Sequence, residues 1–549
     1  MGTLKYFNPK SYVDYASRWV ADLREARPRR SLEECFRQYQ AGFSVNSKRV
    51  ILCEGMWDNP NHFFRLHMML AAMPDAKECR LVCVLRNREE TKQQRTLESL
   101  GATEFIYLEE PVHRGEPFME IARQLLRNVR SHHDLLEVEL PDSLPAYVFY
   151  DTVLKVARHP QPPMDSLLWT TVLAEVLRNL AMYKDFFARH EVVRVVSSHP
   201  WKNEYATLCW TAITHAVPCY YVTGFCEGIR MRRLRTAEDF SMPVEHCASA
   251  DFDALPAAAQ RQVIERGQAY LAERDRGQSS DINARHAFRP DKRETSKAAA
   301  RRILGVPEGK PLVVVYAQVW FDFPHTFAMQ NFTDFLDWIT FTVAQVSKNT
   351  SVTWLLKPHP GDSWYGGVRL ADVLGSLPSH VQLCAEETDS LTTQVAADYA
   401  VTVHGTVAIE ATARGVPVLC ADRSYYGDWA FSYTAKSREE YAQLLASIQS
   451  LARPTEEHRQ RAMAFAALSL APTPEAMGLL RTSCDSSDRR MLYEEIVARF
   501  ERGKERLLVE QNAIGEWLAS AHSSYAAYQT IRHYAPASGP VDQDYPHEP

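Results

Sequence analysis

The sequence lacks the short motifs by which several large enzyme classes are recognised. It contains no GxxxxGKS/T phosphate loop, no GxGxxG fingerprint, no HExxH zinc motif and no nucleophile elbow. No DxD-type acidic pair follows an expected strand, so we expect a site without a metal ion and without a resident cofactor. P-loop enzymes, zinc proteases and serine hydrolases of the α/β type are therefore not indicated.

The sequence also has no CxxC pair and no stretch typical of a membrane span. Its 11 cysteines are scattered mainly through apolar segments, where cysteine behaves as a small hydrophobe. The amino terminus shows no signal-peptide core, and the most apolar long stretch, residues 205–226, is interrupted by His215 and Pro218. We therefore expect a protein of the reducing cytoplasm, with at most a peripheral contact at the inner membrane face.

An excess of positive charge is absent as well. The 549 residues include 62 lysines and arginines against 68 aspartates and glutamates, a formal net charge of −6. This balance argues against a nucleic-acid partner. Hydrophobic residues make up 46% of the chain, which is ordinary for a globular protein and excludes a disordered one.

Short apolar runs alternate with helical patterns in two regions of the chain, which predicts parallel sheets covered by helices on both faces. The expected strands are 49–55, 81–85, 104–108, 192–196 and 218–222 in the first region, and 311–316, 352–356, 381–384, 399–403 and 417–420 in the second. We therefore expect an α/β protein with two Rossmann-like domains.

Composition sets the expected limits of these domains. Residues 271–296 are rich in Arg, Asp, Ser and Gln, which is typical of an exposed linker. We favour C-terminal helices that fold back across the first domain over helices that dimerise or touch a membrane. The expected units are a helical lead-in at 1–45, a first Rossmann-like domain at 46–275, a linker at 276–300, a second Rossmann-like domain at 301–470, helices at 485–533 and a flexible tail at 535–549.

Ligands of open parallel sheets bind beyond the carboxyl ends of the strands, so the loops there are candidate sites. One of these loops reads Lys357-Pro358-His359-Pro360. The two prolines fix the backbone around His359, and Lys357 and His359 offer donors that suit a phosphate. A solvated turn with a capping histidine is the alternative.

A second loop reads His404-Gly405-Thr406 and leads into a helix that carries Glu410. Gly405 permits a tight turn, Thr406 can cap the helix, and the free N–H groups of the helix attract an anion. Glu410 lies one turn further on, where it can accept ribose hydroxyls. The alternative is that Gly405 and Thr406 only make the turn and that Glu410 lies on the surface.

Two further elements follow strands of the same half. One contains Gln318 and Asp322, and the other is the run that begins at Tyr426. Either element can be simple loop packing. Their shared placement at strand ends is the argument for a role in binding.

Together these motifs resemble those of the bacterial capsule-polysaccharide biosynthesis glycosyltransferases, a family that includes the capsule β-Kdo transferases. The resemblance covers residues 310–435, although the small residues that follow the family's Gln-Val-x-x-Asp motif are replaced by Phe323-Pro324. It rests on Gln-Val-x-x-Asp from Gln318, Lys-Pro-His-Pro from Lys357, His-Gly-Thr-x-x-x-Glu-Ala from His404 and Tyr-Gly-Asp-Trp from Tyr426.

The resemblance implies a GT-B fold, in which two Rossmann-like domains face a cleft, and a donor that is an acidic sugar activated by CMP. It implies that the second domain binds this nucleotide sugar and that His359 contacts the nucleotide phosphate. A sister family with another nucleotide donor stays open. The candidate donor-binding residues are Gln318, Asp322, Lys357, His359, His404, Gly405, Thr406, Glu410 and Tyr426.

The first domain must then supply the acceptor side and a catalytic group, which deprotonates the acceptor or acts as a nucleophile. His199 lies in a Ser-His-Pro loop, the counterpart of the His-Pro loop in the other half, although a structural role is the alternative. Asp58 can simply cap the next helix. The candidate catalytic residues at expected strand ends are His199, Glu227, Asp58 and Glu204.

A basic run with Arg230, Arg232 and Arg233 follows the last expected strand of the first half. Such a run is usually a solvated face. Here it can instead bind an anionic acceptor, such as a phosphate-bearing lipid or an acidic glycan.

We therefore expect a glycosyltransferase of surface-polysaccharide assembly that moves a sugar from a nucleotide donor to a glycan or lipid-linked acceptor and can contact a membrane assembly complex. A nucleotide-sugar epimerase or a phosphotransferase on the same scaffold is one alternative, because both use two Rossmann-like domains. A sugar-binding scaffold without turnover is another. Product analysis without an acceptor separates the epimerase, and binding without turnover identifies the scaffold.

Overall fold

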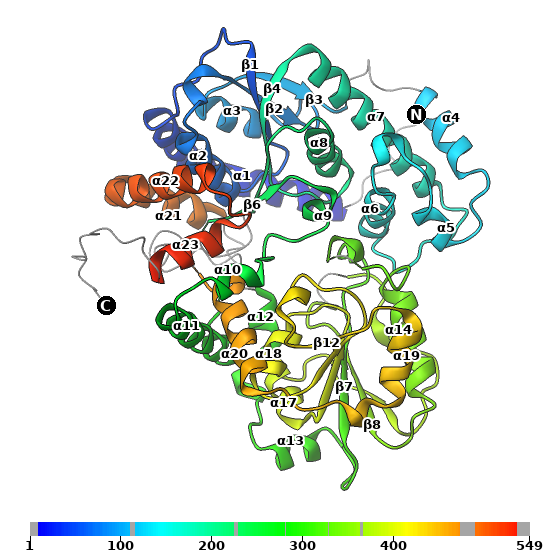
Figure 1. Ribbon diagram of the computed structural model, residues 1–549. Helices are drawn as coiled ribbons and strands as arrows, with labels where there is room; N and C mark the ends of the chain where they lie inside the picture. The colour runs from blue at the N-terminus through cyan, green and yellow to red at the C-terminus, as the bar shows by residue number, and fades with distance from the viewer. Residues whose placement is uncertain are drawn as a thin grey trace.

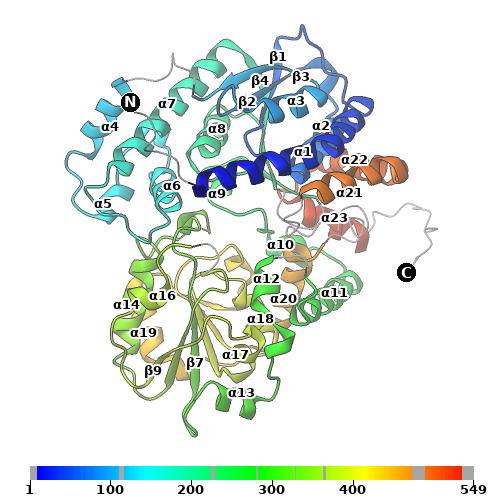
Figure 2. The ribbon, with the colours of Figure 1, turned by 180° about the vertical axis from the view of Figure 1, so that it is seen from behind.

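The protein consists of two α/β halves, which lie one above the other in Figure 1 and are seen from behind in Figure 2. Each half is built on a six-stranded sheet. The computed structural model describes residues 9–109, 116–223, 229–279, 282–327, 329–362, 366–472 and 489–534.

The first sheet orders its strands β3-β2-β1-β4-β5-β6. Strands β1 to β5 are parallel, and β6 pairs antiparallel with β5. All residues of β1 and β2 except the first are buried, because their Val, Ile, Leu and Cys side chains meet helices on both faces of the sheet. The bounds are β1 (Arg49–Glu54), β2 (Arg80–Leu85), β3 (Ala102–Tyr107), β4 (Glu191–Ser197), β5 (Cys219–Thr223) and β6 (Arg230–Leu234).

The second sheet orders its strands β12-β11-β10-β7-β8-β9, and all of its pairs are parallel. Numbered from its own first strand, each sheet has the order 3-2-1-4-5-6 of a doubly wound Rossmann sheet. The expected α/β architecture with two Rossmann-like domains is confirmed. The bounds are β7 (Leu312–Tyr316), β8 (Thr353–Lys357), β9 (Val381–Leu383), β10 (Tyr399–Thr402), β11 (Val418–Cys420) and β12 (Tyr433–Thr434).

All ten expected strands are present close to their predicted ranges, but β6 and β12 were not expected. The sequence patterns did not predict β6 because three of its five residues are arginines, a composition typical of a surface. β12 is only two residues long, too short to show a pattern.

Helices connect the strands and cover both faces of each sheet (Figure 1). In the first half they are α2 (Pro60–Ala72), α3 (Thr91–Ser99), α4 (Glu116–Leu126), α5 (His132–Leu136), α6 (Tyr147–Ala157), α7 (Leu167–Arg189), α8 (Asn203–Thr214) and α9 (Ala237–Phe240). In the second half they are α10 (Ser249–Asp253), α11 (Ala257–Asp275), α12 (Ile282–Ala287), α13 (Lys297–Ile303), α14 (Phe335–Val346), α16 (Leu370–Val373), α17 (Ser390–Ala396), α18 (Val407–Ala413), α19 (Arg438–Ala446) and α20 (Glu456–Phe465).

The first half ends earlier than the expected boundary at residue 275. α11 packs in the core of the second half, where its Val263 joins Phe465. A Cβ on Gly267 of α11 would lie 1.8 Å from the Met463 carbonyl oxygen of α20, so the two helices touch only because Gly267 has no side chain. The chain therefore crosses between the halves after β6 and before α10.

The described residues of the expected linker, 276–279 and 282–300, are not a free-standing exposed linker. This segment contains α12 and the start of α13, and Phe288 within it is buried with Leu391 of α17. The polar composition that predicted a linker belongs to the outer face of a segment whose few apolar side chains face the second half.

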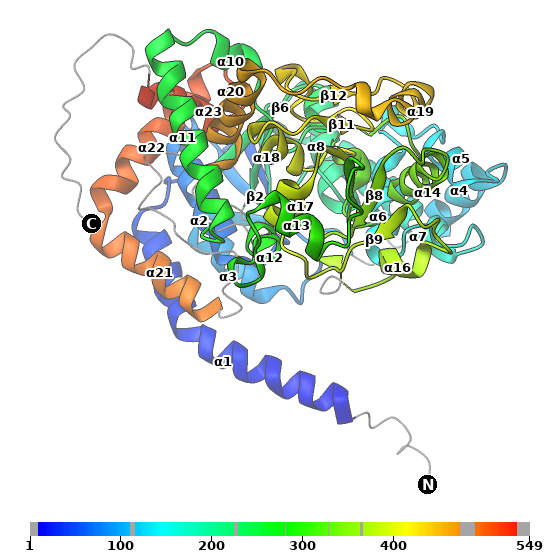
Figure 3. The same ribbon diagram turned by 90° about the horizontal axis from the view of Figure 1, so that it is seen from below.

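The C-terminal helices α21 (Arg489–Arg502), α22 (Lys504–Ala519) and α23 (Tyr525–Tyr534) return to the first half. Phe500 and Trp517 share a core with Phe36 of α1 (Pro9–Gln38) and with the first sheet. Figure 3 shows α1 running alongside α21 and then reaching away from the body at its N-terminal end. None of the helices in the described part of the chain combines the length and the apolar character needed to cross a membrane. The predicted tail at 535–549 lies outside the described residues.

Candidate functional site

A pocket of about 240 Å³ lies beyond the carboxyl ends of β7, β8 and β10. β7 and β10 are adjacent in the sheet, but their connections run to opposite sides, which makes this the topological switch point of the second sheet and the usual ligand site of such folds. The predicted donor-binding residues that line the pocket are Gln318, Asp322, Lys357, His359, His404, Gly405, Thr406 and Glu410.

Tyr426 is the predicted donor-binding residue that does not line this pocket. Its side chain is buried behind the turn, where its hydroxyl donates to the Gly405 carbonyl oxygen at 3.0 Å. Tyr425, the preceding residue, lines the pocket instead. Tyr426 therefore supports the turn and does not contact a ligand in the pocket.

The loop from Lys357 to His359 contains an amine that is hydrogen-bonded within the protein and an imidazole. Lys357 is buried and its Nζ donates to the Thr388 carbonyl oxygen at 2.8 Å, and burial lowers its pKa. His359 is partly buried, and its Nδ1 accepts from the Gly361 backbone N–H at 3.0 Å. An imidazole whose Nδ1 accepts carries its proton on Nε2, so His359 is oriented as a donor.

Position 405 requires glycine because neighbouring side chains leave no room for a Cβ atom. A Cβ at this position would lie 2.9 Å from Thr402 Oγ1 and 3.0 Å from Gln318 Nε2. Gln318 Nε2 in turn donates to Thr402 Oγ1 at 3.2 Å, so the predicted Gln318 and the turn form one unit.

His404 is a neutral, buried imidazole at one end of the pocket. Its ring stacks on Phe327 with centroids 5.0 Å apart and meets the edge of Phe335. Burial, together with the nearby His325, lowers its pKa to about 3. Its Nδ1 has no hydrogen-bond partner within the described part of the chain, which leaves it able to bond to a ligand.

Thr406 does not cap α18 as predicted. Its φ of −57° and ψ of −20° are already helical, and its side chain makes no capping hydrogen bond. An N-cap residue needs an extended backbone to aim its oxygen at the helix, so the helical conformation of Thr406 explains the difference.

Glu410 is buried and held by two side chains. One carboxylate oxygen accepts from Arg274 Nε at 3.1 Å and Nη2 at 2.9 Å, and the other accepts from Gln394 Nε2 at 2.8 Å. Arg274 belongs to α11 and also lines the pocket, and the sequence analysis missed it because α11 had been placed in the other half. Glu410 Oε2 accepts only the bond from Gln394 and has a second lone pair, so acceptance of a ribose hydroxyl stays possible there.

The wall opposite the turn comes from the segment that had been expected to be a linker. Ala284, Ala287 and Phe288 line the pocket, and the Arg274 guanidinium lies 5.9 Å from the Phe288 ring centroid. The pocket therefore has one apolar, aromatic side and one polar side.

The switch point of the first sheet, between β1 and β4, carries a buried charged cluster. Glu54 at the end of β1 is fully buried, and it accepts from the backbone N–H groups of Trp57 and Ser198 at 2.9 Å each. Its carboxylate also lies 3.4 Å from His62 Nε2. Burial opposes ionisation of Glu54, but His62 and the hydrogen bonds outweigh it and lower the pKa to about 2.

His199 lies beside this cluster, at the end of β4. Its Nδ1 is 2.8 Å from Ser198 Oγ, and its ring is surrounded by three aromatic rings. Burial lowers its pKa to about 3, although Glu54 acts in the opposite direction. The imidazole is therefore neutral at pH 7 and a weak base. The three rings belong to Trp57, Trp201 and Tyr205.

Contacts between the halves bring the two switch points toward each other. Trp201, next to His199 in the β4–α8 loop, packs on Phe323 with ring centroids 5.7 Å apart. Lys155 of α6 lies 3.0 Å from Asp322, the predicted donor-site residue of the second half. Figures 1 and 2 show α6 directly above the second half.

Asp58 and Glu204 are occupied by structural ion pairs. Asp58 lies 3.0 Å from Arg29 Nη2 and 2.9 Å from Arg489 Nη2, which ties α1 to α21. Burial raises the pKa of Asp58, but the two arginines outweigh burial and lower it. Glu204 is buried and lies 3.0 Å from Arg86. Asp58 is therefore not a free catalytic base. The remaining candidate, Glu227, lies outside the described residues.

The prediction that Arg230 and Arg232 form a cationic surface for an acceptor is wrong. Both side chains are buried in β6. Arg230 donates to the Ala471 carbonyl oxygen at 3.1 Å, and Arg232 bonds to Asp239 at 2.9 Å. Arg233 stacks on Trp517 and donates to its carbonyl oxygen. The three side chains tie β6 to neighbouring segments, because β6 lies beneath the C-terminal helices.

Within the described ranges, no group of three or more His, Cys, Asp or Glu side chains is placed to hold a metal ion. The sequence matches no family model, and no curated protein matches it.

Solved structures that match include enzymes of two classes. A KpsC β-Kdo 2,4 transferase from Thermosulfurimonas dismutans is 15% identical, with a TM-score of 0.30, over 53% of this chain and 87% of its own. A glycosyltransferase from Rickettsia africae is 10% identical, with a TM-score of 0.27, over 84% and 100%. A UDP-GlcNAc 2-epimerase from Neisseria meningitidis, bound to UDP-GlcNAc, is 9% identical, with a TM-score of 0.23, over 76% and 97%.

Proposed function

We propose that the protein is a glycosyltransferase that takes a sugar from a nucleotide donor bound in the second half and passes it to a saccharide or lipid-linked acceptor at the first half. The observation that carries the proposal is the pairing of two sites. A pocket with phosphate-type donors lies at one switch point and a neutral histidine at the other, and the Trp201–Phe323 contact joins their loops. The proposal includes action in the cytoplasm, in surface-polysaccharide assembly.

On the donor side, the pocket offers a distinct group for each part of a nucleotide. The apolar wall with Phe288 suits the base, and Glu410, fixed by Arg274, suits the ribose hydroxyls. His359, with its proton on Nε2, suits the phosphate. We take the donor to be a CMP-activated acidic sugar, because the motifs resemble those of β-Kdo transferases.

The reaction moves charge from the acceptor to the departing phosphate. His199 accepts the proton of the acceptor hydroxyl, whose oxygen forms a bond to the anomeric carbon while the bond from that carbon to the phosphate oxygen breaks. Burial disfavours the imidazolium that results, and Glu54 in the neighbouring cluster offsets part of this effect. His359 stabilises the charge on the leaving phosphate by donating to it.

A thermal-shift screen tests the donor side. Ligand that binds only the native state raises the melting temperature, and at 100 times Kd the stabilisation is about 2.7 kcal/mol. We expect CMP to stabilise the wild type, and we expect His359→Ala to lose most of this shift because the phosphate donor is gone.

The control variant is His133→Ala, since His133 is exposed on α5. It should keep the whole shift. If only UDP or GDP raises the melting temperature, the second half still binds a nucleotide donor, but the donor is not CMP-activated. If no nucleotide raises the melting temperature, the proposal is contradicted.

A further inference from the structure

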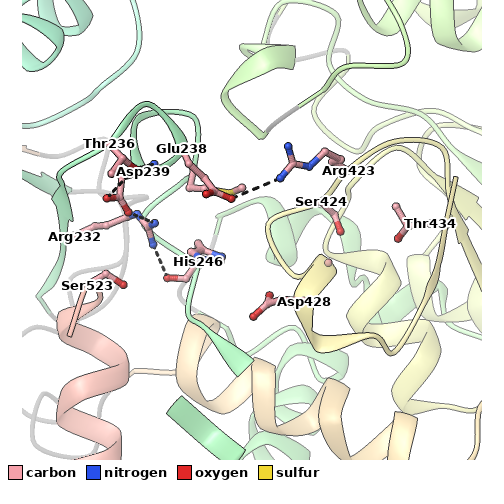
Figure 4. A pocket seen from close by; sticks show the side chains of 12 residues that line it. Arg232, Thr236, Glu238, Asp239, His246, Arg423, Ser424, Asp428, Thr434 and Ser523 are labelled. Carbon is pink, nitrogen blue, oxygen red and sulfur yellow. Dashed lines mark hydrogen bonds and ion pairs between the residues drawn. The ribbon is translucent and has the colours of Figure 1, made fainter. Parts of the chain in front are cut away.

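A second and larger pocket, of about 460 Å³, lies at the junction of the two halves and has no part in the nucleotide site described above. Its size falls within the roughly 300–1,000 Å³ typical of ligand sites. Figure 4 shows Arg232, Asp239 and Ser523 on one side and Ser424, Asp428 and Thr434 on the other. The pocket is thus walled by the chain that crosses between the halves, by the loop after β11 and by the segment before α23.

The charged groups of this pocket form two ion pairs and leave one further carboxylate. Arg232 lies 2.9 Å from Asp239, and Arg423 lies 3.6 Å from Glu238 across the junction (Figure 4). Asp428 is a third carboxylate, and it accepts from the Ser249 backbone N–H at 2.7 Å. No positive charge is left over, so the pocket does not favour phosphate or another anion.

The remaining groups are hydrogen-bonding groups of both kinds. His246 Nδ1 bonds to the Tyr425 carbonyl oxygen at 2.7 Å, so the proton lies on Nδ1 and Nε2 is an acceptor. Burial, with a contribution from Arg232, lowers the pKa of His246 and keeps this ring neutral. Thr236, Ser424 and Thr434 add hydroxyls that both donate and accept.

Apolar ligands do not suit the pocket. Among the described residues that line it, Met242 alone carries an apolar side chain. A lipid tail or an apolar helix would leave the carboxylates and guanidiniums around it without water, which is costly.

We propose that the junction pocket binds a neutral saccharide, whose many hydroxyls match a lining of fixed donors and acceptors in which both guanidiniums are paired with carboxylates. Tyr425 separates this pocket from the nucleotide pocket: it lines the latter, and its carbonyl holds His246 of the former. A saccharide chain at the junction therefore lies next to the donor. The assignment of this saccharide as the non-reacting part of the acceptor rests on the proposed function. The binding of a saccharide in the junction pocket does not.

Gly427 offers a direct test, because it lines the pocket and has room for a side chain. A Cβ there would meet only Ser424 Oγ, at 3.8 Å, and φ at Gly427 is not positive. Gly427→Trp should fill the pocket without disturbing the fold. Gly427→Ala adds one methyl group and is the matched control.

The measurement is saturation-transfer NMR on the full chain with lactose, maltose and di-N-acetylchitobiose as neutral probes, and with digalacturonate and inorganic phosphate as anionic ones. We expect wild type and Gly427→Ala to bind at least one neutral disaccharide, and Gly427→Trp to bind it at least about tenfold more weakly with an unchanged melting temperature. Failure of every neutral probe, preference for an anionic probe, or equal binding by Gly427→Trp would overturn the proposal.

The same samples separate this inference from the proposed function. Gly427→Trp should keep the melting shift with CMP, because the nucleotide pocket is untouched. Disaccharide binding without any nucleotide shift would contradict the proposed function and leave the junction site standing. A melting shift with nucleotide but no disaccharide binding would contradict the junction site and leave the proposed function standing.

Discussion

At the two switch points, the buried environment of single residues determines their protonation states. His199 and His404 are neutral because burial disfavours their charged forms, whereas Glu54 stays charged because His62 and two backbone N–H groups satisfy it. The sequence predicted His199 and His404 as site residues from their place after strands. It did not predict Arg274 or Phe288, because their contribution depends on a long-range packing arrangement that no local pattern records.

His67 illustrates how such burial makes stability depend on pH. It is buried between Phe36 and Phe500, and burial lowers its pKa to about 3. Between pH 6.5 and 3 the unfolded state gains a proton at His67 that the folded state does not, so stability falls as pH falls. His67→Phe should remove this loss and gain about 2 kcal/mol at pH 5 relative to pH 8.

Urea unfolding of both proteins at pH 8 and pH 5 measures this difference. His133→Phe, on an exposed surface, is the control and should follow the wild type. Equal pH dependence of His67→Phe and the wild type would show that His67 is protonated in the folded protein.

The turn at Gly405 should tolerate no side chain. Gly405→Ala places a Cβ 2.9 Å from Thr402 Oγ1, closer than side chains approach, and forces the turn or Gln318 to move. We expect at least about tenfold weaker nucleotide binding by calorimetry, with only a small loss of stability. Gly375→Ala is the matched control, since a Cβ at Gly375 meets nothing within 4 Å. Unchanged binding by Gly405→Ala would remove the turn from the site.

Individual strands and helices were largely predictable where hydrophobic periodicity is local. The inner strands of both sheets are apolar runs that are buried on both faces, whereas the edge strands β3 and β9 are only partly buried. β6 was missed because Arg230, Arg232 and Arg233 read as surface, although their guanidiniums are bound by carbonyls, a carboxylate and aromatic rings. α11 was placed in the wrong half because a helix pattern shows which face is buried but not which neighbour covers it.

The crossing of α11 and α20 gives a prediction at this scale. Gly267→Ala would place its Cβ 1.8 Å from the Met463 carbonyl oxygen, so the helices must separate. We expect a loss of about 1–3 kcal/mol in the free energy of unfolding. The control is Gly515→Ala in α22, where the nearest atom is 3.4 Å away and the change should be neutral or stabilising by up to about 1 kcal/mol. Equal stability of the two variants in urea unfolding would contradict the described packing.

At the scale of the whole molecule, polar pairs join the two halves in addition to the aromatic Trp201–Phe323 contact. His325 of the second half lies 2.7 Å from Asp151 of α6, and Tyr150 donates to Asp334 at 2.6 Å. Burial opposes the charge on His325, but Asp151 outweighs it and raises the pKa. These pairs, with Lys155 and Asp322, hold α6 of the first half against the second half. Sequence patterns predicted two Rossmann-like domains, and the family resemblance implied that they face a cleft. The residue pairs that join the domains are separated by more than a hundred residues and leave no local signal.

Product analysis tests the central claim most directly. Wild type and His199→Gln are incubated with CMP- and UDP-activated sugars, with and without a bacterial glycolipid extract, and the products are identified by mass spectrometry. The account predicts that nucleotide is released together with an acceptor that has gained one sugar, and that His199→Gln is slower by about 100-fold or more because the base is lost. Conversion of the nucleotide sugar to an isomer without an acceptor would contradict the account and assign an epimerase instead, and nucleotide binding without any product would assign a scaffold.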